Sequence, residues 1–168
     1  LTFALELSAK RLQILHEAFP KTSHVVVLVA ADDPVGPSQV SEIETAVRAF
    51  ARVNSIDRHI VEAPQATVGI VTAGKAHYDF MEVLRRLDLD PNALAAAGVR
   101  VYKVGLVYPL EPTRIRAFAH GLTDLLVIEE KAPVVERQIK ELLYHLPDAQ
   151  RPRVVGKFDD TGEWSDKA

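Results

Sequence analysis

Short apolar runs rich in β-branched residues alternate along this chain with amphipathic stretches of helical spacing. Strands and helices that alternate in this way build parallel or mixed sheets covered by helices. The pattern therefore predicts an α/β fold. No repeat or low-complexity tract interrupts it over the 168 residues, a length that suits one compact domain or one and a half.

The first part of the chain predicts a helix, a strand, a loop and a second helix, in that order. The strand is apolar on both faces, as in the middle of a sheet, and a serine caps the second helix. We expect these elements at Leu1 to Phe19, at His24 to Ala30, at Asp32 to Pro37, and from Ser38 or Ser41 to about Asn54.

Beyond a polar, proline-containing linker at Glu62 to Gln65, the pattern becomes more regular. Strands are expected at Thr67 to Thr72, Val99 to Val104, Asp124 to Ile128 and Arg153 to Val155. Helices are expected at Lys75 to Leu87, Pro91 to Ala97, Glu111 to His120 and Ala132 to Leu146. The chain is thus divided into an N-terminal segment packing on the main domain (1–64), an α/β domain (65–158) and a polar, frayed tail (159–168).

Composition excludes several classes of function. With 20 Lys and Arg against 23 Asp and Glu, the chain has no basic excess for nucleic acid or for an anionic membrane. No apolar run is long enough to span a bilayer, and no signal peptide is apparent, so we expect a cytoplasmic protein without a membrane partner. The chain contains 0 Cys, which leaves no ligands for iron–sulfur clusters. It starts at Leu1 and its single methionine is Met81, as expected for a piece of a longer polypeptide.

The clearest string match is Gly69 to Ala76, which fits the phosphate-loop pattern G-x-x-x-x-G-K up to its last position. Two features argue against a nucleotide site. Gly69 and the residues after it lie inside a predicted strand, and Ala76 lacks the hydroxyl that would hold Mg²⁺. A weaker alternative is an anion at the Gly74–Lys75 turn, where helix amides could bind it. A tight turn that needs glycine is the structural alternative.

Acidic residues follow two predicted strands. Asp32 and Asp33 directly follow a predicted strand, where the paired acids of the Mg²⁺ site lie in phospho-accepting receiver domains. Such a domain also needs an aspartate at the end of its third strand, and no later strand of this chain ends in one. A turn with solvated carboxylates is therefore favoured. Glu129, Glu130 and Lys131 lie at the strand end where ligands of α/β sheets usually bind. Adjacent side chains of a strand point to opposite faces, so one glutamate at most faces a site, and the other caps a helix or is solvated. No metal-ligand spacing connects the 6 histidines.

Several separated blocks resemble one family, in the same order. They cover roughly Arg48 to Lys157 and are Val68 to Lys75, Val101 to Pro112, Leu126 to Lys131, Gln138 to Tyr144 and Arg153 to Lys157. The family is that of the indolepyruvate ferredoxin oxidoreductases, a branch of the thiamine-dependent 2-oxoacid:ferredoxin oxidoreductases. The resemblance implies a domain similar to the C-terminal domain of transketolase: a mixed, mostly parallel five-stranded sheet with helices on both faces.

The same resemblance implies an activity for the whole enzyme. Members decarboxylate 2-oxoacids such as arylpyruvates on thiamine diphosphate with Mg²⁺, pass electrons through 4Fe-4S clusters to ferredoxin, and release acyl-CoA. This chain has no G-D-G and N-N pair for Mg²⁺ and diphosphate, and no Cys. The resemblance therefore implies a scaffold that is inactive alone, packs against other domains or subunits and helps to form a homodimer.

We therefore predict no catalytic and no metal-binding residue in this chain. If it contributes to a cofactor site, the strand ends are the candidates. They are Thr72, Gly74, Lys75, the Pro109 to Pro112 turn, Glu129, Glu130 and Lys131. For the turn, a helix entry is the favoured alternative, with Pro112 early in the helix and Glu111 near its positive end. A stand-alone anion- or nucleotide-binding module at Gly74–Lys75 is the alternative function.

Overall fold

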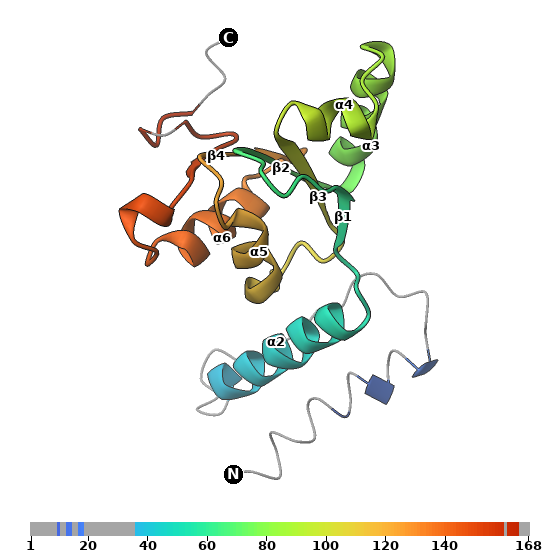
Figure 1. The fold of residues 1–168 in the computed structure, drawn as a ribbon. Coiled ribbons are helices and arrows are strands. Elements are labelled where there is room, and N and C mark those ends of the chain that lie inside the picture. Colours follow the sequence, from blue (N-terminus) through green and yellow to red (C-terminus); the bar gives the residue numbers. More distant parts are fainter. Residues whose placement is uncertain (1–9, 11–12, 15–16, 19–35, 160, 165–168) are drawn as a thin grey trace. The chain divides into compact units, whose positions relative to one another are not determined.

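The computed structural model describes residues 10, 13–14, 17–18, 36–159 and 161–164 (Figure 1). The expected strand at His24 to Ala30 and the acids Asp32 and Asp33 lie outside these residues, as does most of the expected first helix. Its described residues are helical. The chain forms two compact units, Leu1–Phe50 and Ala51–Ala168. No helix in the described ranges is long and apolar enough to cross a membrane.

The first unit contains most of helix α2, Gly36–Val53. Its sequence carries the serine and apolar spacing from which the helix was predicted. On its surface Arg48 and Glu44, four residues apart, form an ion pair at 3.2 Å. The predicted second helix is thus confirmed, with its end within a residue of the expected Asn54.

The second unit holds the sheet. Its strands are β1 (Arg58–Val61), β2 (Val68–Ala73), β3 (Val99–Val104), β4 (Asp124–Ile128) and β5 (Arg153–Val155). Its helices are α3 (Gly74–Arg86), α4 (Pro91–Ala96), α5 (Pro112–Ala119) and α6 (Val134–Leu143), with a short 3₁₀ turn at Asp148–Gln150. The strands lie in the order β1-β3-β2-β4-β5, with β1 antiparallel to β3 and the others parallel. The predicted mixed, mostly parallel five-stranded α/β sheet is confirmed.

One strand was not predicted. β1, Arg58–Val61, lies before the expected boundary at residue 65 and pairs with β3 through Arg58 and Lys103. It is an edge strand, and a register shift between His59 and Val61 interrupts its pairing. The sheet therefore includes residues that the sequence analysis placed in the N-terminal segment.

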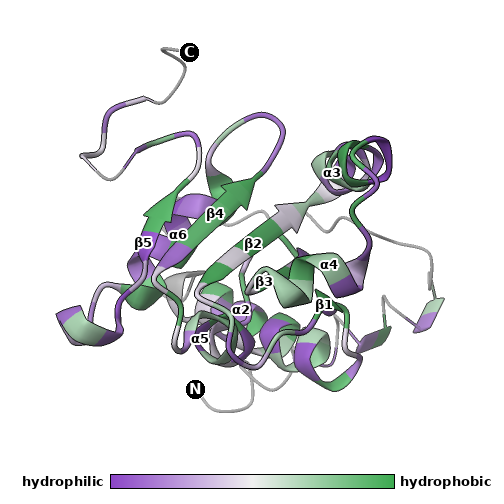
Figure 2. Cartoon of the chain, turned by 45° about the horizontal axis from the view of Figure 1, so that its top comes forward, coloured by the Kyte–Doolittle hydropathy of each residue, from purple (hydrophilic) through white to green (hydrophobic). Residues whose placement is uncertain are grey.

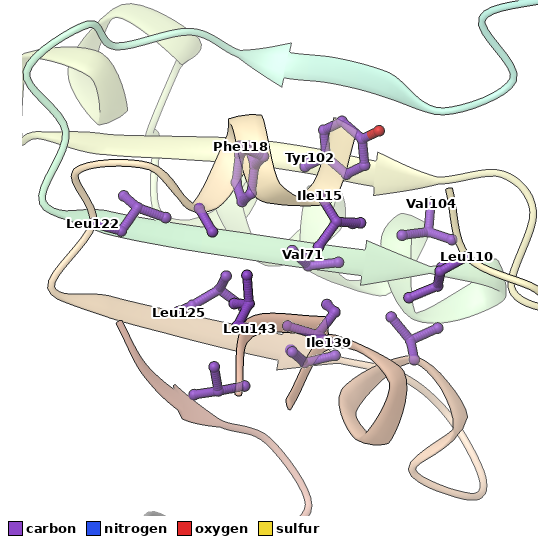
Figure 3. Packing of buried hydrophobic residues seen from close by; sticks show 14 of the residues in the cluster. Val71, Tyr102, Val104, Leu110, Ile115, Phe118, Leu122, Leu125, Ile139 and Leu143 are labelled. Carbon is purple, nitrogen blue, oxygen red and sulfur yellow. The ribbon is translucent and has the colours of Figure 1, made fainter. Parts of the chain in front are cut away.

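Helices lie on both faces of the sheet, α5 and α6 on one and α3 and α4 on the other (Figure 1). The larger core lies under α5 and α6, where Val71, Tyr102 and Leu125 pack against Ile115 and Ile139 (Figure 3). The smaller core lies under α3 and α4 and contains Val61, Leu84, Leu94 and Val101. The alternation along each strand sends neighbouring side chains into different cores.

A buried carboxylate connects the start of β1 to the end of β3. Asp57 is 2% exposed and accepts bonds from Tyr102 Oη at 3.2 Å and from the Gly105 and Leu106 N–H groups at 2.8 and 3.3 Å. Burial and the Asp57 charge raise the pKa of Tyr102. Because these donors would lack partners without the carboxylate, Asp57 fixes the loop that follows β3.

The described residues of the C-terminal end make contacts with one another and with α6. Phe158 and Trp164 form an antiparallel bridge with their rings at 5.0 Å, and Asp159 Oδ1 accepts bonds from the N–H groups of Thr161 and Glu163, each at 2.9 Å. Glu136 of α6, which is 0% exposed, accepts from the Lys157 N–H at 2.7 Å. The described tail residues thus contact one another as far as Trp164, and the frayed tail stays a prediction.

Candidate functional site

The candidate site lies where β2 and β4 end side by side. From β2 the chain continues through α3 to β3 on one side, and from β4 it continues through α6 to β5 on the other. Connections that leave neighbouring parallel strands in opposite directions, over opposite faces, open the crevice in which α/β proteins usually bind ligands. The topology thus brings the predicted candidates to one edge of the sheet. Thr72 lies near the end of β2 with Gly74 and Lys75 after it, and Glu129, Glu130 and Lys131 follow β4.

Gly74 is the first residue of α3 and has a φ of +56°, a conformation that favours glycine. The preceding residue, Ala73, makes no side-chain cap, so the helix begins without a side-chain acceptor. Gly69, the first glycine of the phosphate-loop string, lies within β2, where a Cβ would approach Leu122 Cδ1 to 2.4 Å. The glycine at position 69 is therefore explained by close packing within a strand and not by a phosphate loop.

Lys75 is exposed and pairs with a residue of its own helix. Its Nζ lies 2.7 Å from Asp79 Oδ2, one turn further along α3. The hydrogen bond and charge of Asp79 raise the pKa of Lys75, and Glu130 adds a smaller attraction across the crevice. Lys75 and Glu130 thus carry opposite charges beyond the ends of two neighbouring strands.

Thr72 is fully buried and contacts a histidine that the sequence analysis did not select. Its Oγ1 lies 2.9 Å from His77 Nδ1 and 3.3 Å from the carbonyl oxygen of Tyr102, to which the hydroxyl can donate. Burial lowers the pKa of His77, and the nearby Lys103 ammonium lowers it further. The lowered pKa of His77 favours the neutral imidazole, and the contact between Thr72 and His77 joins the first turn of α3 to the end of β2.

Glu129 is occupied by helix α6. Its carboxylate accepts bonds from the N–H groups of Val134, Val135 and Glu136 at 3.0, 2.9 and 3.0 Å. These donors have no partners within the helix, and a negative charge is favoured at this end. Glu130, which is exposed, stands apart from this cap. The prediction that only one of the two glutamates faces a site, while the other caps a helix or is solvated, agrees with this arrangement.

The Pro109 to Pro112 turn is a helix entry, as the favoured alternative predicted. Glu111 is 1% exposed and caps α5 by accepting from the Arg114 N–H at 2.8 Å, and Pro112 is the first helical residue. The Tyr108–Pro109 bond is cis. The amide of Gln138 fixes the turn against α6: its Oε1 accepts from Leu110 N at 2.9 Å.

The described part of the chain offers no metal centre at this crevice. No group of three His, Asp or Glu side chains there could hold a metal ion. Two surface hollows, of about 420 and 600 Å³, are lined by other residues, the first between Glu62 and Gly98 and the second beside Tyr144 and Arg153. Thr72, Lys75 and Glu129 are therefore engaged by contacts within the fold, whereas Glu130 and Lys131 are exposed.

Comparison with known proteins gives a family for most of the chain. Residues 57–168 match the family model described as the indolepyruvate ferredoxin oxidoreductase middle domain. A relative from Methanothermobacter marburgensis, named indolepyruvate oxidoreductase subunit IorA, is 26% identical over 157 residues, which is 94% of this chain and 24% of the relative. The subunit of the same name from Pyrococcus horikoshii is 30% identical over 99 residues, 58% of this chain and 14% of the relative. The chain thus spans about a quarter of the first relative's length and less of the second's.

Two solved structures are also matched. One is a 2-oxoglutarate:ferredoxin oxidoreductase from Magnetococcus marinus with 2-oxoglutarate, coenzyme A and succinyl-CoA bound, with a TM-score of 0.44 and 14% identity over 80% of this chain and 22% of that one. The other is a split-gene transketolase, an inactive β4 tetramer, with a TM-score of 0.44 and 18% identity over 66% of this chain and 34% of that one.

Proposed function

The chain belongs to the indolepyruvate ferredoxin oxidoreductase middle-domain family, as its sequence blocks predicted, and we propose that it is a non-catalytic scaffold domain of a larger thiamine diphosphate-dependent enzyme. That enzyme oxidatively decarboxylates indolepyruvate-type 2-oxoacids to acyl-CoA, with ferredoxin as electron acceptor. Its other domains or subunits are the proposed partners of this chain, and the cytoplasm is its proposed location. Association of two copies of this chain stays a prediction.

The observation that carries the proposal is the use of the crevice side chains by the fold itself. Glu129 holds the first turn of α6, Thr72 holds His77, and Lys75 pairs with Asp79. A catalytic acid, base or electrophile must be within reach of a substrate and able to change its bonds during the reaction. Side chains that hold helix ends in place support a structural role instead.

The cofactors of the proposed enzyme do not fit this chain. With 0 Cys it offers no thiolate for a 4Fe-4S cluster, and its described residues bring together no metal-binding group. We therefore propose that thiamine diphosphate, Mg²⁺ and the clusters are held by other parts of the enzyme, where CoA also reacts. No chemical step is assigned to any residue here.

Two measurements test the proposal. The parent enzyme, supplied with indolepyruvate, CoA and ferredoxin, should form acyl-CoA, while the 168-residue chain alone should not. Thermal unfolding of the chain should not change with thiamine diphosphate and Mg²⁺ or with CoA. A ligand at a hundredfold excess over Kd stabilises the folded state by about 2.7 kcal/mol, which such a scan detects. Stabilisation by CoA would contradict the scaffold role and make the domain part of the acyl-acceptor site.

The alternative function is tested in the same scan with ATP and Mg²⁺. A stand-alone nucleotide- or anion-binding module at the Gly74–Lys75 turn predicts stabilisation by ATP that is lost in Lys75→Ala. Asp79→Ala is the matched control because it frees Lys75 from its ion pair. Stronger stabilisation in Asp79→Ala together with loss in Lys75→Ala would replace the scaffold proposal.

A further inference from the structure

A row of polar side chains crosses the sheet at the edge where β2 and β3 end. Arg58 of β1 is paired in register with Lys103 of β3, and Lys103 is paired with Thr72 of β2. Paired residues of neighbouring strands point to the same face of a sheet. At this edge β2 runs directly into α3 (Figure 2). The register therefore places two cations side by side at the edge where α/β sheets usually bind their ligands.

Two residues of α3 complete a group that we call the basic cluster: Arg58, His77, Tyr78 and Lys103. The ring of Tyr78 contacts two of the others. Lys103 Nζ lies 4.8 Å from the ring centroid and 3.5 Å from the hydroxyl, and the His77 ring lies 5.4 Å away between centroids. Tyr78 is 65% exposed, Arg58 is exposed and Lys103 is half-buried. Small solutes therefore reach the basic cluster.

The two cations of the basic cluster have no carboxylate partner in the part of the chain that the structure describes. Lys75 and Arg86, by contrast, are each paired with a carboxylate. Like charges directly opposite each other on neighbouring strands destabilise a sheet. Arg58 and Lys103 therefore lower stability unless an anion neutralises them.

His77 adds a hydrogen-bond acceptor to the basic cluster. The Thr72 hydroxyl can donate to the Tyr102 carbonyl oxygen at 3.3 Å, and it then accepts from His77 Nδ1 at 2.9 Å. A neutral imidazole carries one N–H, so the lone pair lies on Nε2. No group of the described residues bonds this atom. The basic cluster thus offers two cationic donors and one acceptor.

We propose that the basic cluster binds a small hydroxy acid. The carboxylate accepts from the Arg58 guanidinium and the Lys103 ammonium, and the hydroxyl donates to His77 Nε2. A phosphate ester fits less well, because most of it is doubly ionised at neutral pH and then its free oxygens only accept. Binding makes and breaks no covalent bond, so the site is compatible with a non-catalytic scaffold.

A titration with sodium lactate tests the proposal. The probe is added to the ¹⁵N-labelled 168-residue chain at constant ionic strength, kept with sodium chloride, and amide signals are followed by NMR. We expect a saturable shift at His77, Tyr78 and Lys103, with a Kd of about 1 mM. Sodium acetate, which lacks the hydroxyl, should bind about fivefold more weakly.

Variants locate the site. Lys103→Gln and Arg58→Gln each remove one charge, so lactate should bind at least about tenfold more weakly to either. Arg86→Gln is the matched control, because it removes a cation of α3 that is paired with Glu82 outside the basic cluster. It should bind lactate like the unchanged chain. The same spectra show whether each variant is folded, and either cluster variant suffices if the other is not.

Several outcomes would overturn the inference. No saturable shift in the unchanged chain would mean that the two cations are only solvated or are neutralised by another segment. Unchanged binding in Lys103→Gln and Arg58→Gln, or equal weakening in Arg86→Gln, would show that lactate does not bind at the basic cluster. Tighter binding of methyl phosphate than of lactate would replace the hydroxy acid by a phosphate. None of these outcomes depends on the activity of the parent enzyme, so a failure here leaves the proposed function standing.

Discussion

The two faces of the sheet are formed by the same strands but are buried to different extents. On the face under α5 and α6, Leu125 and Val127 of β4 are 0% and 4% exposed. Leu126, between them on the same strand, points to the other face and is 37% exposed. Strand alternation assigns each side chain to a face, but only the helices packed there decide whether it leaves water.

The largest test of this difference compares Leu125→Ala with Leu126→Ala, two neighbouring positions with the same side chain. Removing the fully buried Leu125 leaves a cavity in the larger core, so we expect the free energy of unfolding to fall by about 3 kcal/mol. Removing the partly solvated Leu126 should lower it by about 1 kcal/mol or less. Urea unfolding of both variants and the unchanged chain measures the two losses.

The m-value of each transition is the control, because unchanged m shows that the shift in midpoint reports stability. Equal losses at the two positions would mean that the face under α3 is covered as completely as the other.

The sequence predicted most of this sheet because the signals are local. β4 and β5 have the expected bounds, Asp124–Ile128 and Arg153–Val155, and each is a short apolar run between clear turns. β1 was missed because Arg58–Val61 has only four residues, two of them polar, and its partner β3 lies about 40 residues further along. Such a strand is specified by a non-local pairing that no local window contains.

The candidate site was predicted only in part. Strand alternation gave the cap of α6 as one alternative for the adjacent glutamates. Both of them follow the last residue of β4, Ile128, so the cap is set by the loop that leads into α6. The contact between Thr72 and His77 could not be foreseen, since it depends on the turn at Gly74 that folds α3 back onto the end of β2. Helical spacing rules describe neighbours within one helix and do not extend across such a turn.

A second test compares the carboxylate caps of the helices on the two faces. Glu129 accepts three backbone bonds from α6, whereas Asp90 accepts one from Ala93 N, at 2.7 Å, at the start of α4. We expect Glu129→Ala to cost about 2 kcal/mol and Asp90→Ala about 1 kcal/mol of unfolding free energy. Chemical denaturation followed by circular dichroism gives both values.

Glu130→Ala is the control for the first of these variants, since it removes the neighbouring carboxylate without touching the cap, and it should change stability by about 0.5 kcal/mol or less. A larger loss of unfolding free energy in Glu130→Ala than in Glu129→Ala would contradict this expectation. Glu130 would then make contacts at the crevice that the cap of α6 does not explain. The comparison would then favour a binding site at this edge.

The smallest expected effect is a pH dependence that arises from His77, on the less covered face. Its pKa lies below the ordinary 6.5 because burial disfavours the imidazolium and the Lys103 ammonium repels it. At His77 the unfolded chain therefore binds a proton at a pH where the folded chain does not. The contribution of His77 to stability is thus greatest above pH 6.5 and falls as the pH is lowered towards the folded pKa. His77→Gln keeps an amide that can bond Thr72 but does not titrate. We expect acidification from about pH 8 to about pH 5 to lower the free energy of unfolding of the unchanged chain more than that of His77→Gln. A constant difference over this range would mean that the folded protein accommodates the imidazolium, and that the Thr72–His77 contact is open enough to water to solvate the added charge.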